Sequence, residues 1–157
     1  MNKIMPCLWF DNRIDEAIDF YTSTFKSAKV HDIKRQTPDG PAFTAVIELE
    51  GHKFMLLNGS QGGEPTRFPF TEAVSFMIDC ADQAEVDYFW NAFVGNGGAE
   101  SMCGWCKDRF GLSWQVVPRQ IFSTVFGADQ AGAGRAMQAM LGMKKLIVAD
   151  LEKAYAG

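Results

Sequence analysis

This sequence lacks long hydrophobic runs and clustered cysteines, and it has few histidines. No segment approaches the roughly 20 consecutive apolar residues of a membrane-spanning helix, and the N-terminus reaches Pro6 and Asp11 without an apolar signal core. Four cysteines in 157 residues are too few for a disulfide scaffold. The two histidines, His31 and His52, leave little material for a histidine-dependent triad. These absences predict a cytoplasmic protein with reduced thiols and no membrane partner.

The sequence also lacks a cluster of positive charge. Its 15 basic residues are scattered along a chain of formal net charge −4. A surface that tracks a phosphate backbone needs grouped Lys and Arg, so we expect no nucleic-acid partner. Hydrophobic residues make up 47% of the chain and charged residues 22%, which is typical of a globular domain with a packed core. At this length we expect one compact domain, or two small halves around a shared core.

Hydrophobic periodicity divides the chain into two halves with one plan. The first half predicts a strand at 4–10, a helix capped by Asp11 or Asn12, and strands at 28–35, 43–50 and 53–58. The second half predicts a strand at 74–80, a helix capped by Asp82, and strands near 100–105 and 112–117, with one strand missing or rudimentary. A tight turn over 108–111 precedes the last strand, and Gly111 can take a positive φ there. The pattern is an internal repeat.

Three segments carry a resemblance to a known family. They are Phe20-Tyr21 with Phe25 in the first helix, residues 85–90 in the second, and the run from Gly104-Trp105 through Pro118. With them the chain resembles the PhnB-like, or "3-demethylubiquinone-9 3-methyltransferase", family of the vicinal-oxygen-chelate (glyoxalase and bleomycin-resistance) superfamily. The resemblance implies an α+β fold of two βαβββ-type repeats, with curled mixed sheets around a cleft and helices at the C-terminus. It also implies a homodimer.

The expected domain boundaries follow from this plan. We predict a single domain over 1–157, with a first repeat at 3–58, a linker at 59–72, a second repeat at 73–118 and a helical tail at 119–157. The tail resembles the C-terminal helices of the family. Its methionines recur at helical spacing, which indicates packing or a dimer contact more than ligand binding.

Metal-dependent members of the superfamily hold a divalent ion with His, Glu or Gln side chains on the first and last strands of each repeat. By resemblance, the corresponding positions on the first strands are Ile4 and Ser75, and Gln115 stands on the last strand of the second half. The fourth position falls on His52 or Asn58. One amide and at most one histidine make a poor ligand set, because zinc sites use three or four strong ligands. We therefore expect no metal and no cofactor.

Side-chain alternation predicts the lining of the cleft. Val74, Phe76 and Ile78 would form the buried face of their strand, which turns the residues between them towards the cleft. In the first half, Ile4, Leu8 and Phe10 are expected on the cleft side. The candidate ligand-binding residues are Leu8, Phe10, Asn58, Ser75, Met77 and Gln115. The polar anchors among them are Gln115, Ser75 and Asn58, and such a mostly apolar lining is typical of a small-molecule pocket.

The sequence contains one C-x-x-C motif, formed by Cys103 and Cys106. It precedes a strand, whereas a helix N-terminus is the setting that lowers the pKa of a thiol. A zinc site would also need Cys7 and Cys80, which alternation places on the helix-covered side. We expect free thiols, and the resemblance favours Cys103 as the reactive one if any is.

Two further patterns have ordinary structural explanations. Trp9, Trp90 and Trp114 have the parity of the layer between strands and helices, so we expect them to pack there and not to stack on a ligand. The methyltransferase activity in the family's name would need a Gly-rich loop between a parallel strand and a helix. The glycines at 132 and 134 fall inside the helical tail instead, so the sequence does not support a cofactor site of that kind.

Together these patterns predict a metal-free, PhnB-like protein that binds a small, largely apolar molecule. Two alternatives stay open. The chain could be an enzyme of the same superfamily, either a metal-dependent lyase or dioxygenase-like protein or the methyltransferase of the family name. It could also be a non-catalytic dimeric module whose cleft is filled by its own side chains.

Overall fold

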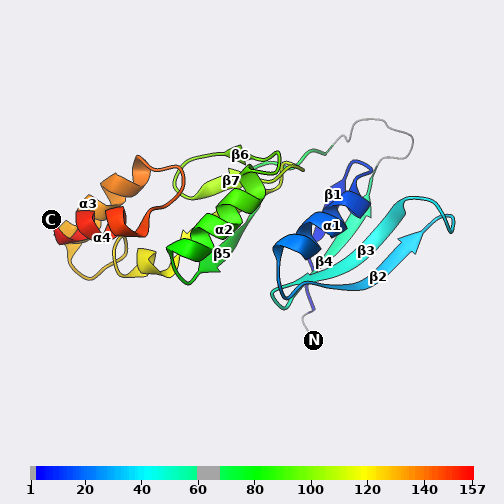
Figure 1. Ribbon diagram of the computed structural model, residues 1–157, viewed down its shortest axis with the longest axis horizontal. Helices are drawn as coiled ribbons and strands as arrows, with labels where there is room; N and C mark the ends of the chain where they lie inside the picture. The colour runs from blue at the N-terminus through cyan, green and yellow to red at the C-terminus, as the bar shows by residue number, and fades with distance from the viewer. Residues whose placement is uncertain (1–2, 60–67) are drawn as a thin grey trace. The chain divides into compact units, whose positions relative to one another are not determined.

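The computed structural model describes residues 3–59 and 68–157, and the chain divides into two compact units, Met1–Pro69 and Phe70–Gly157. Each unit contains a helix packed on one face of a four-stranded sheet (Figure 1). The boundary between the units falls inside the predicted linker 59–72, of which residues 60–67 lie outside the described part of the chain.

The first unit has the order strand, helix, three strands. Its elements are β1 Cys7–Phe10, α1 Ile14–Thr24, β2 Lys29–Arg35, β3 Ala42–Leu49 and β4 His52–Asn58. The strands lie in the order β1-β4-β3-β2, with β1 parallel to β4 and the other neighbours antiparallel. Each predicted element is present to within a few residues, and β1 is shorter than the 4–10 segment that was expected.

The second unit repeats this plan. Its elements are β5 Ser75–Cys80, α2 Gln83–Val94, β6 Ala99–Glu100, β7 Trp105–Lys107 and β8 Ser113–Pro118. The order β5-β8-β7-β6, with β5 parallel to β8, matches the first sheet strand for strand. The α+β prediction of two βαβββ repeats followed by C-terminal helices is confirmed. The rudimentary strand is β6, which has two residues.

Register identifies the helix-covered face of the first sheet. Leu8 pairs with Leu56 and Phe10 with Asn58, and all four side chains are buried. Asn58 bonds to the backbone at the start of α1, so this face is the one that α1 covers. The prediction that Leu8 and Phe10 line a cleft is therefore wrong, since both lie in the core between sheet and helix.

The first helix is capped in a way that the sequence did not indicate. Its N-cap residue is Arg13, which makes no side-chain cap, in place of the predicted Asp11 or Asn12. Asn58 supplies the missing acceptor from β4: its Oδ1 accepts a hydrogen bond from Ile14 N at 3.3 Å, and its Nδ2 donates to Ala42 O. Side-chain oxygens satisfy exposed N–H groups at helix starts in this way, normally from a neighbouring position in the chain.

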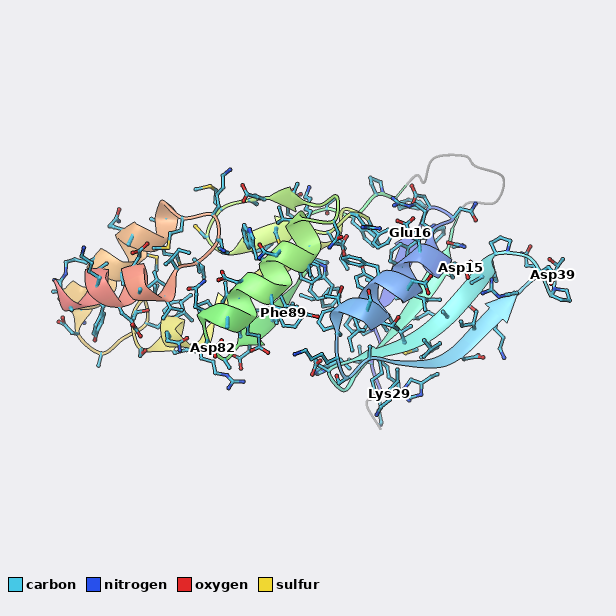
Figure 2. All side chains as sticks on the ribbon, viewed as in Figure 1. Asp15, Glu16, Lys29, Asp39, Asp82 and Phe89 are labelled. Carbon is cyan, nitrogen blue, oxygen red and sulfur yellow. The ribbon has the colours of Figure 1, made fainter. Side chains whose placement is uncertain are left out.

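The second helix follows its prediction. Asp82 is the N-cap, and its Oδ1 accepts from Glu85 N at 3.0 Å, while Glu85 reaches back to accept from Ala81 N at 2.6 Å. Figure 2 shows Asp82 at the start of α2 and Phe89 further along the helix. Phe89 belongs to the buried stripe of α2, together with Val86, Trp90 and Phe93. The Asp82 cap was readable from sequence because its partner, Glu85 N, is three residues along the chain.

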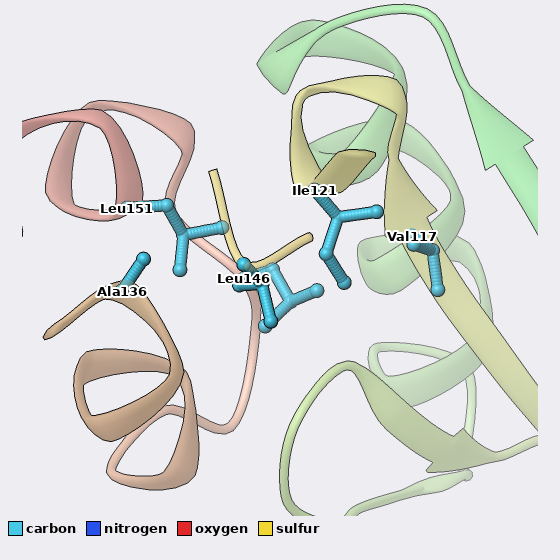
Figure 3. Close-up of a cluster of buried hydrophobic side chains, with 6 residues drawn as sticks. Val117, Ile121, Ala136, Leu146 and Leu151 are labelled. Atoms are coloured by element: carbon cyan, nitrogen blue, oxygen red, sulfur yellow. The ribbon is translucent and has the colours of Figure 1, made fainter. Parts of the chain in front are cut away.

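The tail folds against the second unit. It consists of a short 3-10 helix, Arg119–Phe122, and of α3 Gln130–Leu141 and α4 Val148–Ala156. A buried cluster joins it to β8 (Figure 3). Its members are Val117, Ile121, Val125, Ala136, Leu146 and Leu151, and Met137, Met140 and Met143 pack against them. No helix in the described ranges has the length and hydropathy to cross a membrane.

Hydrogen bonds from one side chain and from the backbone fasten the segment before α4 to the rest of the unit. The Gln83 amide in α2 accepts from Val148 N at 2.7 Å and donates to Leu146 O at 3.2 Å. Cys103 N and Gly104 N donate to Met143 O and Lys144 O, each at 2.7 Å. The tail is therefore part of the second unit's structure, and its removal would expose the start of α2 and the buried face beside β8.

The turn before β8 is organised by one buried carboxylate. Asp108 is 2% exposed. Its Oδ1 accepts from Phe110 N and Leu112 N at 2.9 and 3.1 Å, and its Oδ2 accepts from the indole Nε1 of Trp114 at 2.9 Å. Gly111 has φ +85°, as predicted from the turn pattern. The carboxylate fixes where β8 begins, and with it the face to which each β8 side chain points.

Replacement of Asn58 by alanine tests the cross-strand cap. The variant leaves the buried Ile14 N–H and Ala42 C=O without their partner, and we expect the free energy of unfolding to fall by roughly 1–3 kcal/mol. Urea unfolding followed by circular dichroism measures the change. Asn91→Ala, on an exposed position of α2, is the matched control; equal losses for the two variants would contradict the role of Asn58.

Replacement of Asp108 tests the turn. Asp108→Ala removes an acceptor for three donors, so we expect a loss of at least about 2 kcal/mol in the free energy of unfolding. Asp108→Asn keeps one oxygen and should lose less, while the Trp114 indole N–H resonance shifts in both variants. Asp39→Ala, in an exposed turn, should be close to neutral. An Asp108→Ala protein as stable as Asp39→Ala would refute the assignment.

Candidate functional site

The second sheet has one face against α2 and one turned away from it. Trp114 stacks on Phe93 of α2, with ring centroids 4.9 Å apart, and Phe76 contacts Trp114 on the same side. Alternation then turns the residues between them to the opposite face. We call this the open face of the second sheet, and the residues considered on it are Ser75, Met77, Trp105, Lys107, Ser113 and Gln115. The same face continues to Asp79 and Val117, where Val117 packs against the tail.

Strand register arranges these six residues in two rows. Ser113 of β8 lies between Ser75 of β5 and Lys107 of β7, which makes a polar row. Gln115 lies in the same way between Met77 and Trp105, which makes a mixed row. Met77 is 57% exposed and Trp105 is half-buried. The face therefore presents polar groups beside accessible apolar surface, which is the composition of small-molecule sites.

A hydrogen bond joins two of the predicted anchors. Gln115 Nε2 donates to Ser75 Oγ at 2.9 Å, and both side chains are partly buried. This bond orients the Gln115 amide and leaves its Oε1 as an acceptor and the Ser75 hydroxyl proton as a donor. Of the predicted ligand-binding residues, Ser75, Met77 and Gln115 thus share one face.

Two polar residues of this face were not among the sequence-predicted site residues. Ser113 is 1% exposed, and its Oγ has no hydrogen-bond partner in the described part of the chain. Lys107 is half-buried and forms an ion pair with Glu72. The hydrogen bond that the Lys107 ammonium donates lowers the pKa of the Glu72 carboxyl. The sequence shows that Ser113 and Gln115 point to the same face of their strand, because they are two residues apart. The pairing that brings Lys107 beside Ser113 depends on strand register and is not visible in the sequence.

The remaining predicted residues lie elsewhere. Leu8 and Phe10 are in the core of the first unit, and the amide of Asn58 is used by Ile14 and Ala42. We therefore do not carry these three forward as contacts for a ligand. Without Asn58, Gln115 and Ser75 are the predicted polar anchors that remain.

The first sheet also has a face turned away from its helix, and two expectations about it were wrong. Trp9 is 40% exposed and contacts Phe68 edge-on, with ring centroids 5.5 Å apart, so it does not pack under α1. Cys7 has the same parity and is exposed, in contrast to the predicted helix-covered position. Trp90, Trp114 and Cys80 are buried, as expected.

A one-residue difference in register explains these errors. The family resemblance matched Ile4 with Ser75, an offset of 71 residues, whereas the ladders end at Phe10 and at Cys80, an offset of 70. A shift of one residue moves every side chain of a strand to the other face. By the observed ladders, Cys7 pairs with Met55 as Met77 pairs with Gln115, so Met55 is the counterpart of Gln115 in the first unit.

The residues at the superfamily's metal positions in the second unit do not fit a transition-metal ion. Ser75 and Gln115 are neutral and are bonded to each other, whereas such ions favour imidazole, thiolate and carboxylate ligands. No group of three or more His, Cys, Asp or Glu that could hold a metal occurs within 3–59 and 68–157. We therefore derive no metal-dependent step, and the absence of a cofactor stays a prediction.

The four thiols differ in environment. Burial raises the pKa of Cys80 and of Cys106 to about 12, with nearby carboxylates acting in the same direction. Cys7 is exposed, and Cys103 is partly exposed in a turn where its φ is +57°. Cys103 and Cys106 therefore do not form a matched reactive pair, because the second thiol is held protonated and out of reach of solvent.

Alkylation kinetics test this ranking. The thiolate is the reacting species, so at pH 8 we expect iodoacetamide to modify Cys7 first and Cys103 next, with Cys80 and Cys106 at least about tenfold slower. Peptide mapping by mass spectrometry measures the four rates, and protein unfolded in urea should react at all four positions. If Cys106 in the folded protein were modified as fast as Cys7, its assignment to a buried environment would be wrong.

Comparisons with known proteins agree with this architecture. A sequence model described as 3-demethylubiquinone-9 3-methyltransferase matches residues 2–117, so the match ends at the tail. A Bacillus cereus PhnB protein with the same methyltransferase label is 28% identical, with a TM-score of 0.65 over 74% of this chain and 99% of that one. None of the curated proteins compared with the chain matches it.

More distant structures share the fold. Protein PA1353 from Pseudomonas aeruginosa is 19% identical, with a TM-score of 0.60 over 75% of this chain and 98% of that one. The fosfomycin resistance protein FosX from Listeria monocytogenes, solved with Mn(II) and a sulfate ion, is 14% identical, with a TM-score of 0.50 over 73% of this chain and 89% of that one. This chain belongs to the 3-demethylubiquinone-9 3-methyltransferase (PhnB-like) family.

Proposed function

We propose that this protein binds a small, largely apolar molecule on the open face of the second sheet. The observation that carries the proposal is the Gln115–Ser75 hydrogen bond, which holds an oriented amide between the accessible side chains of Met77 and Trp105. An oriented polar pair set in apolar surface gives a ligand both direction and burial. Membership of the family fixes the fold and does not by itself assign a ligand or a reaction. The proposal therefore depends on the residues of the open face.

The proposal does not include a reaction. The six residues of the open face offer two hydroxyls, one amide and one ammonium, and the Lys107 ammonium is engaged by Glu72. No observation on the described residues favours the lyase, dioxygenase-like or methyltransferase alternatives over binding. A homodimer and a cytoplasmic location stay predictions from the resemblance and the composition.

Titration of isotope-labelled protein with neutral ring compounds tests the proposal. We expect benzamide and a quinone to shift the backbone amide signals of Met77 and Gln115 and the indole signal of Trp105. Gln115→Leu removes one hydrogen-bonding group from the face, so the affinity should fall about fivefold, the factor that corresponds to a net hydrogen bond of about 1 kcal/mol.

Gln138→Leu, at an exposed position of α3, is the matched control and should bind as the unchanged protein does. Signals that move only in the first unit, or a Gln115→Leu protein that binds every compound as well as the Gln138→Leu control, would refute the site.

A further inference from the structure

The hydroxyl of Ser113 is an unexplained polar group. It is buried and has no hydrogen-bond partner among the described residues, although its residue lies in the middle strand pairing of the second sheet. Buried hydroxyls in folded proteins are nearly always bonded, so this one needs a partner from outside the chain, either a water molecule or a ligand. A hydroxyl in this position has one proton to donate.

The neighbours of Ser113 are also donors. Ser75 lies beside it on β5 and accepts from Gln115, so its own proton is left for another acceptor. Lys107 stands directly opposite on β7, at a pair distance of about 4.5–5.5 Å between Cβ atoms. Two hydroxyl protons and one ammonium group therefore lie along one row of the sheet. A group that matches all three donors is an oxygen acceptor with negative charge.

The acceptor that Lys107 has within the chain is an exchangeable one. Glu72 precedes β5, and its side chain is 62% exposed, against 35% for Lys107. Ion pairs between accessible side chains are worth little, because water and salt compete for both partners. The carboxylate of Glu72 can thus be replaced at Lys107 by an anion that also takes the hydroxyl protons of the serines.

We infer that the ligand of the open face carries an anionic oxygen group, a carboxylate or a phosphonate, which accepts from Ser113 and Ser75 and pairs with Lys107 in place of Glu72. The inference rests on the proposed function and adds the chemical class of the ligand. The apolar part of the same ligand lies on the mixed row, over Met77 and Trp105. Gln115 then orients Ser75 and does not itself meet the charge.

Three probes with one ring and different head groups test the inference. Benzoate and phenylphosphonate carry the anion, and benzamide is the neutral match. We expect both anions to bind the open face at least about tenfold more tightly than benzamide at low salt, with the difference shrinking as salt is added. Whichever of the two anions binds more tightly shows whether the site fits a planar carboxylate or the three oxygens of a phosphonate. Calorimetry gives the affinities, and amide shifts at Ser113 and Lys107 give the location.

Variants of single residues separate the contributions. Lys107→Met should lower the affinity for the anions about tenfold and leave benzamide unchanged, and Ser113→Ala should lower it about fivefold. Glu72→Gln should raise anion affinity by up to about fivefold, because the internal competitor is gone. Lys34→Met, which removes an exposed ammonium of β2 that pairs with Asp32, is the matched control and should change nothing.

The outcomes distinguish the two proposals. If benzamide binds this face and the anions bind no more tightly, the anionic class is wrong and the binding function stands. If none of the probes, charged or neutral, reaches the face, both are wrong. A loss of affinity in Glu72→Gln would also overturn the inference, because it would make Glu72 a contact for the ligand and not its competitor.

Discussion

The buried carboxylate of Asp108 is the constraint on which the second unit depends. It accepts two backbone N–H groups of the turn and the indole N–H of Trp114, so it fixes the turn and the first helix-facing side chain of β8 together. Once Trp114 is held against Phe93 of α2, Ser113 and Gln115 must point the other way. The polar face of the second sheet is thus a consequence of how its apolar face is anchored.

The two repeats share a topology and solve the same local problems differently. Both begin a helix just after an edge strand, where the first N–H groups need acceptors. In the second repeat Asp82 meets that need at the helix start, where its Oδ1 accepts from Glu85 N. In the first repeat Asn58 meets it from β4, forty-four residues along the chain, and also ties down Ala42. An amide that would suit a ligand site is thereby used to hold the first unit together.

Sequence reasoning succeeded where the partners of a residue are close in the chain. The turn ending at Gly111 and the Asp82 cap follow from spacing alone, because each depends on contacts within one turn of backbone. The burial of Trp90 follows from the hydrophobic stripe of its helix. The family segments extended this to the repeat and to the fold. Sequence reasoning failed for four residues of β1, because a misalignment of one residue between the halves moves every side chain of the strand to the opposite face. These residues are Leu8, Phe10, Trp9 and Cys7.

The amino-acid order thus determined the elements and their repeat, since hydrophobic period and turn chemistry are local properties, and it predicted Ser75 and Gln115 as candidate anchors. The pairing of strands decided the rest. It brought Lys107 opposite Ser113, set Gln115 against Ser75 and withdrew Asn58 into a cap, and none of these contacts could be read from the chain. The physical reason is that ladder register between distant strands is chosen by the packing of whole faces, whose free energy belongs to no single segment.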